Sequence, residues 1–392
     1  MSKEIFSYVK LKDVADVEIS SVDKKCKENE IEVSLCNFVD VYYNWAITER
    51  KADSFMKATA RQSEIDRFAL KKGQVAITKD SETKYDIGVA TYIADDFDNV
   101  ILGYHCALIT PNENKLSGKY LNAFFHTKFV QKYFELNATG SGQRFTLSLD
   151  AIKDMPIYLP SLSKQKEIAE IFSKIDRKIE LNEAINDNLS HMLQLIYQQR
   201  FCSNKNFKQG ILSDICEYSK SKIKDLNITP YNYYSTDNML PNKAGATQAT
   251  YLPNGTLPTY CAKGDVLISN IRPYFKKIVY CQKDAGCSSD VLCFTPKNKA
   301  FSQYLFCTLY SDNFFDFMVS TSKGTKMPRG DKSQIMEFKI FIPNEEELVL
   351  FNQLSAPILD LIEANETGKT ELLSLRDTLL PLLMNGQVEI SN

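Results

Sequence analysis

The 392-residue sequence has one tryptophan and three histidines, and it lacks the short motifs of common enzyme classes. It contains no Gly-x-x-x-x-Gly-Lys-Ser/Thr phosphate loop, no Gly-x-Gly-x-x-Gly turn and no Gly-x-Ser-x-Gly elbow. The Asn/Asp-Pro-Pro-Tyr stretch of amino-methyltransferases is absent, as is any convincing nuclease arrangement of Pro-Asp and Glu-x-Lys. No motif surrounds His105, His126 or His191, so we interpret each as structural or exposed. We therefore expect no catalytic residue on this chain.

Long apolar runs and metal-ligand patterns are missing as well. No stretch approaches the roughly 20 uninterrupted apolar residues that span a bilayer, so we predict no membrane association. The ten cysteines form no Cys-x-x-Cys pair, and the even spacing of Cys281, Cys287 and Cys293 is typical of strand positions. We expect buried, reduced thiols, no bound metal and no cofactor on this chain. Reduced thiols favour a cytoplasmic location.

Charge is distributed unevenly, although the net charge is only −2. Residues 206–340 contain 17 basic and 11 acidic side chains, whereas residues 341–392 contain 2 basic and 9 acidic ones. Residues 1–155 are nearly balanced, with 21 basic and 23 acidic side chains. This polarity is compatible with a nucleic-acid surface and a protein-binding tail, and it establishes neither.

The most informative feature is an internal repeat. Asp150–Pro160 aligns with Ser333–Pro343 at an offset of 183 residues, and the same offset continues beyond the prolines. Upstream the offset grows slowly, as loop insertions would cause. The aligned positions include Ile152 with Ile335, Glu180 with Glu363, Asn182 with Asn365, Gly140 with Gly324, Lys72–Thr78 with Lys263–Ser269, and Leu11–Val14 with Leu212–Ile215. Because these matches are collinear, we predict a tandem duplication.

Both copies predict the same order of elements. The front part of each copy alternates and is rich in β-branched and aromatic residues, which predicts strands. These are expected at Val75–Ile77, Val89–Ile93 and His105–Ile109, and at Val266–Ser269, Lys277–Cys281 and Val291–Phe294. Helical spacing predicts a helical stretch at Lys119–Leu136 and another at Ser302–Val319. A Gly-rich turn, a strand ending in Pro160 or Pro343, and a long helix complete each copy.

The long helix of the first copy has the pattern of a coiled coil. No Gly or Pro occurs from Ser163 to about Phe201, and apolar residues alternate at spacings of four and three around a polar centre. Asn182 and Asn365 fall at the same position of the repeat, where a buried asparagine fixes register at a cost in stability. The second copy is less regular, because its pattern is interrupted by Pro357, Gly368 and Pro381.

We predict that the two long helices pair antiparallel and form a spacer. The alternative is two amphipathic helices that each pack on their own domain. The predicted fold is therefore two tandem α/β (mixed α+β) domains joined by an antiparallel coiled coil, with a pseudo-two-fold repeat. The expected boundaries are 1–160 for the first domain, 161–205 for the first helix, 206–343 for the second domain, and 344–392 for the second helix and tail.

The predicted loops gather polar, basic and aromatic residues at matching places in both copies. Arginine can make paired hydrogen bonds to guanine and asparagine to adenine, while lysine suits phosphates. For any single residue, an ordinary solvated loop is the alternative. The candidate DNA-contacting residues are Asn37, Tyr42, Tyr43, Asn44, Thr78, Lys79, Lys84, Tyr85, Gln143, Arg144, Ser235, Thr236, Asn238, Ser269, Asn270, Arg272, Tyr274, Lys276, Lys277, Lys326 and Arg329.

Three segments together resemble the specificity subunit of type I restriction-modification systems. They are the turn Thr139–Gln143, the strand Met155–Pro160 leading into Lys164-Gln165-x-x-Ile168, and Gly264–Arg272. The resemblance covers nearly the whole chain and depends on the order domain, helix, domain, helix. The chain departs from the family at Asn344–Glu347, where the helix usually starts with a glutamine-containing segment, and in its acidic, interrupted second helix.

The resemblance implies two target-recognition domains that each read half of a bipartite site in double-stranded DNA. It also implies two modification subunits that dock on the helices and methylate adenine with S-adenosylmethionine, and restriction subunits for cleavage. Two rival interpretations remain at this point. One is a methyltransferase or nuclease fused to its recognition domain, and the other is a coiled-coil adaptor whose domains bind proteins.

Overall fold

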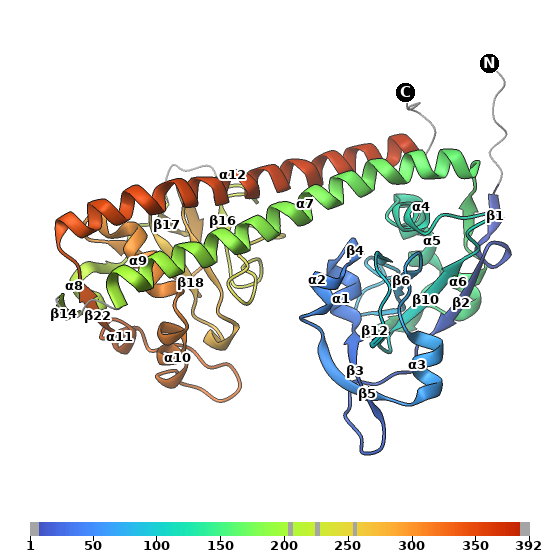
Figure 1. The fold of residues 1–392 in the computed structure, drawn as a ribbon, viewed down its shortest axis with the longest axis horizontal. Coiled ribbons are helices and arrows are strands. Elements are labelled where there is room, and N and C mark those ends of the chain that lie inside the picture. The colour runs from blue at the N-terminus through green and yellow to red at the C-terminus, as the bar shows by residue number, and fades with distance from the viewer. Residues whose placement is uncertain (1–7, 203–206, 224–227, 254–256, 385–392) are drawn as a thin grey trace. The chain divides into compact units, whose positions relative to one another are not determined.

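The computed structural model describes residues 8–202, 207–223, 228–253 and 257–384. The chain divides into two compact units. The first unit comprises Met1–Leu181 and Gly368–Asn392, and the second comprises Asn182–Thr367. Each unit contains a mixed α/β domain together with part of both long helices (Figure 1).

The two long helices are α7 (Leu162–Tyr197) and α12 (Glu345–Met384). Residues 162–181 of α7 belong to the first unit and residues 182–197 to the second, and α12 is divided in the same manner. The division into 1–160, 161–205, 206–343 and 344–392 remains a proposal about the domains.

The first unit is built around a five-stranded sheet in the order β2-β10-β6-β8-β4. The sheets β5-β3-β9, β11-β12-β7 and β1-β13 accompany it. The strands are β1 Tyr8–Lys10, β2 Ala15–Ile19, β3 Ile31–Cys36, β4 Ala46–Ile47, β5 Met56–Ala60, β6 Val75–Thr78, β7 Asp80–Ser81, β8 Ala90–Ile93, β9 Val100–Leu102, β10 Cys106–Pro111, β11 Thr139–Ser141, β12 Arg144–Thr146 and β13 Pro156–Tyr158. The shorter helices are α1 Phe38–Tyr43, α2 Glu49–Ala52, α3 Gln62–Phe68, α4 Gly118–Phe125, α5 Lys128–Asn137 and α6 Leu149–Lys153.

The second unit repeats this plan with a four-stranded sheet in the order β15-β21-β18-β19. The sheets β16-β20-β17 and β14-β22 accompany it. The strands are β14 Lys208–Ile211, β15 Cys216–Tyr218, β16 Tyr233–Tyr234, β17 Thr259–Cys261, β18 Val266–Ser269, β19 Ile278–Tyr280, β20 Ala285–Cys287, β21 Val291–Pro296 and β22 Lys339–Ile342. The shorter helices are α8 Leu212–Ile215, α9 Ser302–Tyr310, α10 Asp312–Ser320 and α11 Lys332–Ile335.

The strand registers of the two units correspond. Thr78 at the end of β6 pairs with Cys106 of β10, and Ser269 at the end of β18 pairs with Val291 of β21. The strand before each long helix pairs with an early strand of its unit, β13 with β1 and β22 with β14. The tandem duplication predicted from the sequence is therefore confirmed in the fold.

A buried tyrosine anchors the helical layer of each unit. Tyr120 of α4 donates a hydrogen bond to the carbonyl of Tyr158 over 2.9 Å, and Tyr304 of α9 donates one to the carbonyl of Phe341. Burial raises the pKa of Tyr304 to about 12, because a phenolate would lose its solvation there. Both hydroxyls therefore act as neutral donors at equivalent positions of the repeat.

The helical stretches predicted at Lys119–Leu136 and Ser302–Val319 are confirmed, and each consists of two helices. Thr127 separates α4 from α5, and Ser311 separates α9 from α10. Both hydroxyls accept a backbone hydrogen bond from the third residue of the following helix. A hydroxyl residue in such a position caps a new helix, and its local bonds compete with continuation of the preceding one.

The start of α7 is held by the side chain of Gln165, which is fully buried. Its Nε2 donates to the carbonyls of Lys115 and Pro160 over 3.0 and 2.9 Å, and its Oε1 accepts from the amide of Ser117 over 2.9 Å. Leu348 occupies the equivalent position at the start of α12 and is buried without such bonds. The second copy thus has an apolar contact where the first copy has the three hydrogen bonds of Gln165, which we call the Gln165 clamp.

We expect Gln165→Leu to destabilise the first unit by about 2–4 kcal/mol, because three backbone groups lose their buried partner. Unfolding can be followed by the fluorescence of Trp45, the single tryptophan of the chain. The matched control is Leu348→Met in the second unit, which keeps the volume and should cost less than about 1.5 kcal/mol. Its unfolding is followed by circular dichroism, because Trp45 lies in the first unit. A Gln165→Leu chain as stable as the parent would contradict the Gln165 clamp.

The helix α12 is continuous although three residues interrupt its sequence pattern, namely Pro357, Gly368 and Pro381. Before the first proline, the Ser355 hydroxyl donates to the carbonyl of Phe351 over 2.8 Å. One turn away, the Asn352 amide donates to the carbonyl of Ala300 over 2.9 Å. Packing of buried side chains such as Phe351, Ile358 and Leu380 outweighs the poor helix propensity of proline and glycine.

The two long helices pair antiparallel within each unit. In the first unit, Leu380 and Leu383 of α12 share a core with Phe172 of α7. In the second unit, Tyr197 near the end of α7 packs on Phe351 near the start of α12, with ring centroids 6.4 Å apart. The predicted antiparallel pairing is confirmed.

Asparagines meet at the centre of the pattern, within the second unit. Asn365 donates from Nδ2 to Asn186 Oδ1 over 2.8 Å, and Asn186 donates to Glu366 Oε1 over 3.0 Å. Asn182 makes a longer contact of 3.5 Å to the carbonyl of Asn365. Buried amides are costly unless they satisfy one another, so these contacts favour one register. Fixing the register remains a proposed role for Asn182 and Asn365.

Trp45 contacts two basic side chains within the first unit. The His126 ring stacks on it with centroids 4.3 Å apart, and the Arg376 guanidinium of α12 lies 4.4 Å from its centroid. Burial, with a smaller effect from the charge of Arg376, lowers the pKa of His126 to about 3. The histidine therefore stays neutral in the folded unit.

We expect acid to destabilise the first unit through His126. An unfolded histidine has a pKa of about 6.5. Below that pH, His126 binds a proton in the unfolded state but not in the folded state. This contribution is fully present above about pH 6.5 and falls by up to about 1.4 kcal/mol per pH unit toward pH 3. His126→Phe keeps a ring on Trp45 and should reduce the loss. Urea denaturation at neutral pH and at about pH 5 measures it; equal losses in parent and variant would contradict this role.

Candidate nucleic-acid interface

The loops after the central strands β6 and β18 share one backbone frame. The amide of Lys79 donates to the carbonyl of His105 over 2.7 Å, and the amide of Asn270 donates to the carbonyl of Asp290 over 2.8 Å. Lys79 thus corresponds to Asn270, and His105 to Asp290. The backbone hydrogen bond is the same in both domains while the side chains differ, and such loops are suited to binding different ligands.

His105 lies one residue before β10, instead of within the predicted strand His105–Ile109. Its φ angle of 73° is in the left-handed region, which non-glycine residues rarely adopt. This conformation allows its carbonyl to accept from Lys79 while its ring reaches Asp80. Contacts distant in sequence therefore outweigh the local strand preference.

In the first domain, Asp80 is the centre of a polar cluster. Its carboxylate accepts from Lys79 Nζ and from Arg144, each over 3.1 Å, and contacts the His105 ring. Burial opposes ionisation of Asp80, but hydrogen bonds from Thr146, His105 and Lys79 outweigh it and hold the pKa of Asp80 well below its usual range. The cluster therefore keeps a carboxylate beside its cations at neutral pH.

In the second domain, polar side chains join the loop at Ser235 to the end of β18. Thr236 and Ser269 lie with their hydroxyls 3.2 Å apart, and Lys277 Nζ donates to the carbonyl of Thr236 over 2.7 Å. Asn238 is buried, and its side chain accepts from the Ser235 amide over 2.7 Å and donates to two carbonyls. These contacts position the loop, and Asn238 is engaged within it.

Asn270 and Arg272 carry buried polar atoms that have no hydrogen-bond partner among the described residues. These atoms are Asn270 Oδ1 and Arg272 Nε, and Asn270 is only 7% exposed. Arg272 also has a left-handed φ of 51°. Unsatisfied buried groups and strained backbone both cost free energy, and both occur often at ligand-binding loops.

Each domain also places an arginine against the residue at the His105/Asp290 position. Arg144 of β12 contacts His105 and Asp80, while Arg329 donates to Asp290 Oδ1 over 3.1 Å. The two side chains remain 59% and 52% exposed. Each arginine is thus held at one end and open to solvent along much of its length.

The segment Asn37–Asn44 forms α1 with its two caps. Asn37 accepts from the amide of Phe38 over 2.9 Å, and Asn44 donates to the carbonyl of Asp40 over 2.8 Å. Tyr42 donates to Asp86 over 3.3 Å, whereas Tyr43 is largely exposed. The asparagines are thus engaged in helix capping, whereas Tyr43 is the candidate of this segment that stays largely exposed.

The remaining candidates occupy different surroundings. Thr78 is fully buried and accepts from the amide of Val89 over 3.0 Å. Lys276 pairs with Asp312 of α10 at 2.7 Å. The candidates on the surface are Lys84, which lies 5.6 Å from the ring centroid of Tyr85, and Tyr85, Gln143, Tyr274 and Lys326. Contact of any of these residues with DNA remains a proposal.

Sequence reasoning did not single out Asp80, His105 or Asp290 as site residues. Asp80 and Asp290 carry no motif, and His105 was interpreted as structural. The available signal was position, since each lies beside the end of a central strand in a copy of the repeat. The strand register was needed to recognise that His105 and Asp290 correspond.

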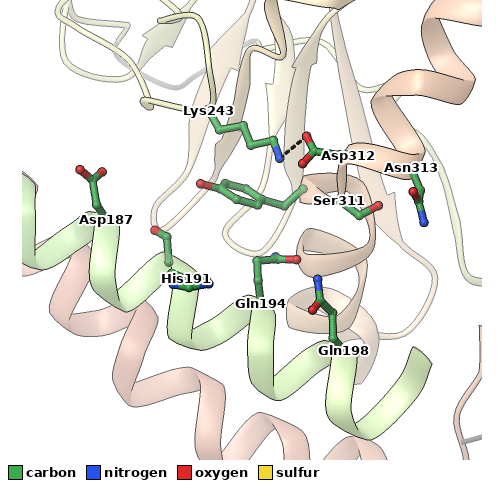
Figure 2. Close-up of a pocket in the computed structure, with 10 residues that line it drawn as sticks. Asp187, His191, Gln194, Gln198, Lys243, Ser311, Asp312 and Asn313 are labelled. Atoms are coloured by element: carbon green, nitrogen blue, oxygen red, sulfur yellow. Dashed lines mark hydrogen bonds and ion pairs between the residues drawn. The ribbon is translucent and has the colours of Figure 1, made fainter. Parts of the chain in front are cut away.

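A polar pocket of about 540 Å³ lies within the second unit, between α7 and the start of α10. Figure 2 shows His191 and Gln194 of α7 lining it, with Lys243 and Asp312 joined by an ion pair of 2.9 Å. Hydrogen bonds from Lys276 and Lys243 lower the pKa of Asp312 to about 2. Asp312 is shared by Lys243 and Lys276, and Asp187 adds a second acidic side chain to the lining. These charges balance, so the pocket offers little attraction to a phosphate.

Among residues 8–202, 207–223, 228–253 and 257–384, no group of three or more His, Cys, Asp or Glu is arranged to hold a metal ion. The cysteines are free thiols, and only Cys26 and Cys202 are exposed. Within the same described ranges, no helix combines the length and apolar character needed to cross a membrane.

Comparison with known proteins gives consistent matches. Residues 4–191 and 204–375 match the family described as the type I restriction modification DNA specificity domain. The MjaVIII specificity subunit of Methanocaldococcus jannaschii is 24% identical over 302 residues, covering 69% of this chain and 71% of that protein. The HindI specificity subunit of Haemophilus influenzae is 26% identical over 134 residues, covering 34% of this chain and only 28% of that protein.

The fold is shared with a solved structure. The type I restriction-modification S subunit from M. genitalium superposes with a TM-score of 0.52 at 14% identity, covering 100% of this chain and 99% of that chain. Tandem mixed α/β domains with paired long helices define a class of DNA-specificity subunits. The chain belongs to the type I restriction modification DNA specificity domain family, with two copies of the domain in tandem.

Proposed function

We propose that this chain is the DNA-recognition subunit of a type I restriction-modification complex and has no catalytic activity of its own. Each domain reads one half of a bipartite site in double-stranded DNA, and α7 and α12 set the spacer between the halves. One observation carries this proposal: the two domains present different side chains on the same frame, Lys79 against Asn270 and His105 against Asp290. Equivalent frames with unlike side chains should read unlike half-sites.

The partner subunits bind the helical region in this proposal. Within the second unit, α7 exposes Ile185, Met192 and Leu195 at spacings of seven and three, and α12 exposes Leu354 and Leu361 seven residues apart. Exposed apolar side chains at this spacing fit the seam of a helix from another chain. We assign this surface to two modification subunits, which bind S-adenosylmethionine. Restriction subunits complete the complex, which acts in the cytoplasm.

Selection from a random pool of duplex DNA tests this function. The chain, purified with its modification subunits, should enrich two sequence blocks separated by a fixed gap. Its affinity should fall steeply as salt rises, because phosphate contacts release counterions. The rival interpretation, an adaptor whose domains bind proteins, predicts no enriched sequence and no steep salt dependence. Enrichment of one continuous block would contradict the division into half-sites.

A further inference from the structure

Arg144 and Arg329 lie at neighbouring positions of the repeat, each on the second strand of a hairpin. The hairpins are β11–β12 in the first domain and the segment closed by the Lys323–Arg329 bridge in the second. Thr146 pairs with Asp80 across strands β12 and β7, and Arg329 forms the corresponding bridge with Ile271. Arg329 therefore corresponds to Thr146, and Arg144 lies two residues earlier on the same strand. Side chains two residues apart on a strand share a face. Both arginines consequently project from the same face toward the His105/Asp290 position.

Both arginines are held by acidic groups while most of the side chain stays exposed. Arg144 donates to Asp80 over 3.1 Å and contacts His105, and Arg329 donates to Asp290 over 3.1 Å. Exposed ion pairs contribute little to folding stability. Folding stability alone therefore does not explain why both copies have an arginine facing the His105/Asp290 position. The arginine has different acidic partners in the two copies.

We propose that Arg144 and Arg329 each read a guanine in the half-site of their own domain. Asp80 with His105, and Asp290, are the positioning residues that hold these arginines. An arginine fork can make paired hydrogen bonds to the O6 and N7 atoms of guanine. A carboxylate on one nitrogen fixes the rotamer in advance, so less conformational entropy is lost on binding. This inference rests on the proposed function and specifies the base that each domain recognises.

Base substitution in a bound duplex tests the assignment. Replacing guanines one at a time by 7-deazaguanine removes the N7 acceptor, and the parent complex should lose about 10- to 100-fold in affinity at one position in each half-site. Arg144→Met should abolish this sensitivity in one half-site and leave the other unchanged, and Arg329→Met should do the reverse. Lys332→Met is the matched control, because it removes an exposed cation outside the candidate DNA-contacting residues, and it should keep both sensitivities.

Conservative variants separate positioning from folding. Asp80→Asn and Asp290→Asn keep the side-chain shape and should reduce discrimination between target and random duplex several-fold, with little change in binding to random DNA. Arg144→Lys keeps the charge and should lose the 7-deazaguanine sensitivity. If Arg144→Lys and Arg144→Met both keep the parent's sensitivity, the assignment is overturned. If the parent complex binds no duplex selectively, the proposed function itself fails.

Discussion

Inserting seven residues into both α7 and α12, after Leu181 and after Thr367, is expected to lengthen the non-specific spacer of the DNA target by about three base pairs. Seven residues add roughly 10 Å of helix, and each base pair adds about 3.4 Å. The insertion points adjoin Asn182 and Thr367, close to the contact of Asn182 with Asn365. A whole heptad in both helices preserves the pairing pattern on either side.

The control for this experiment is a seven-residue insertion in α7 alone. It lengthens α7 but not α12, so the helix pairing cannot be kept in both units. Either the 2.8 Å contact of Asn365 with Asn186 in the second unit or the packing of Phe172 with Leu380 in the first unit is lost. We expect that variant to lose stability and selective binding together. Target selection with the double insertion decides the matter, since an unchanged gap between the two sequence blocks would contradict a helical spacer.

Ile185→Glu combined with Met192→Glu is expected to weaken binding of the modification subunits by at least about 100-fold. Both side chains are nearly half exposed, at 46% and 44%, so the chain should still fold. Burying two carboxylates against apolar partner side chains would remove the hydrophobic contact and add a desolvation cost. Co-purification and the rate of adenine methylation measure the effect.

The matched control replaces the same two residues by leucine. Ile185→Leu with Met192→Leu keeps apolar side chains of similar volume and should bind the modification subunits almost as the parent does. Thermal melting of the two variants reports whether each is folded. Equal rates of methylation by complexes with the glutamate and leucine variants would show that the exposed apolar surface of α7 does not bind the modification subunits.

The repeat and the helix pairing could be predicted because their signals are long and periodic. Collinear matches such as Ile152 with Ile335 extend over both copies, and the seam of α7 continues for several heptads. The break between α4 and α5 was missed because it depends on one hydroxyl, Thr127, within an otherwise helical pattern. Local capping outweighed apolar spacing there.

The candidate residues were predicted to lie in loops, which is wrong for Asn37–Asn44, because this segment forms the helix α1, and for Arg144, which lies in the strand β12. Residues such as Arg144 and Arg329 were selected for their chemistry, but their partners Asp80 and Asp290 are distant in sequence. Asn238 and Thr78 have the same polar character, yet they are buried and bonded within their own domain. Composition does not distinguish a side chain that reads a ligand from one that holds a loop, because both require polar groups.

The central claim is that this chain gives a modification complex its target sequence. Mapping methylated bases in a host genome with and without this chain, with the partner subunits present in both cases, tests it most directly. We predict one bipartite motif of two unlike blocks at fixed spacing, with methylated adenines that disappear when the chain is absent. A methylation pattern that is the same with and without the chain would contradict the account.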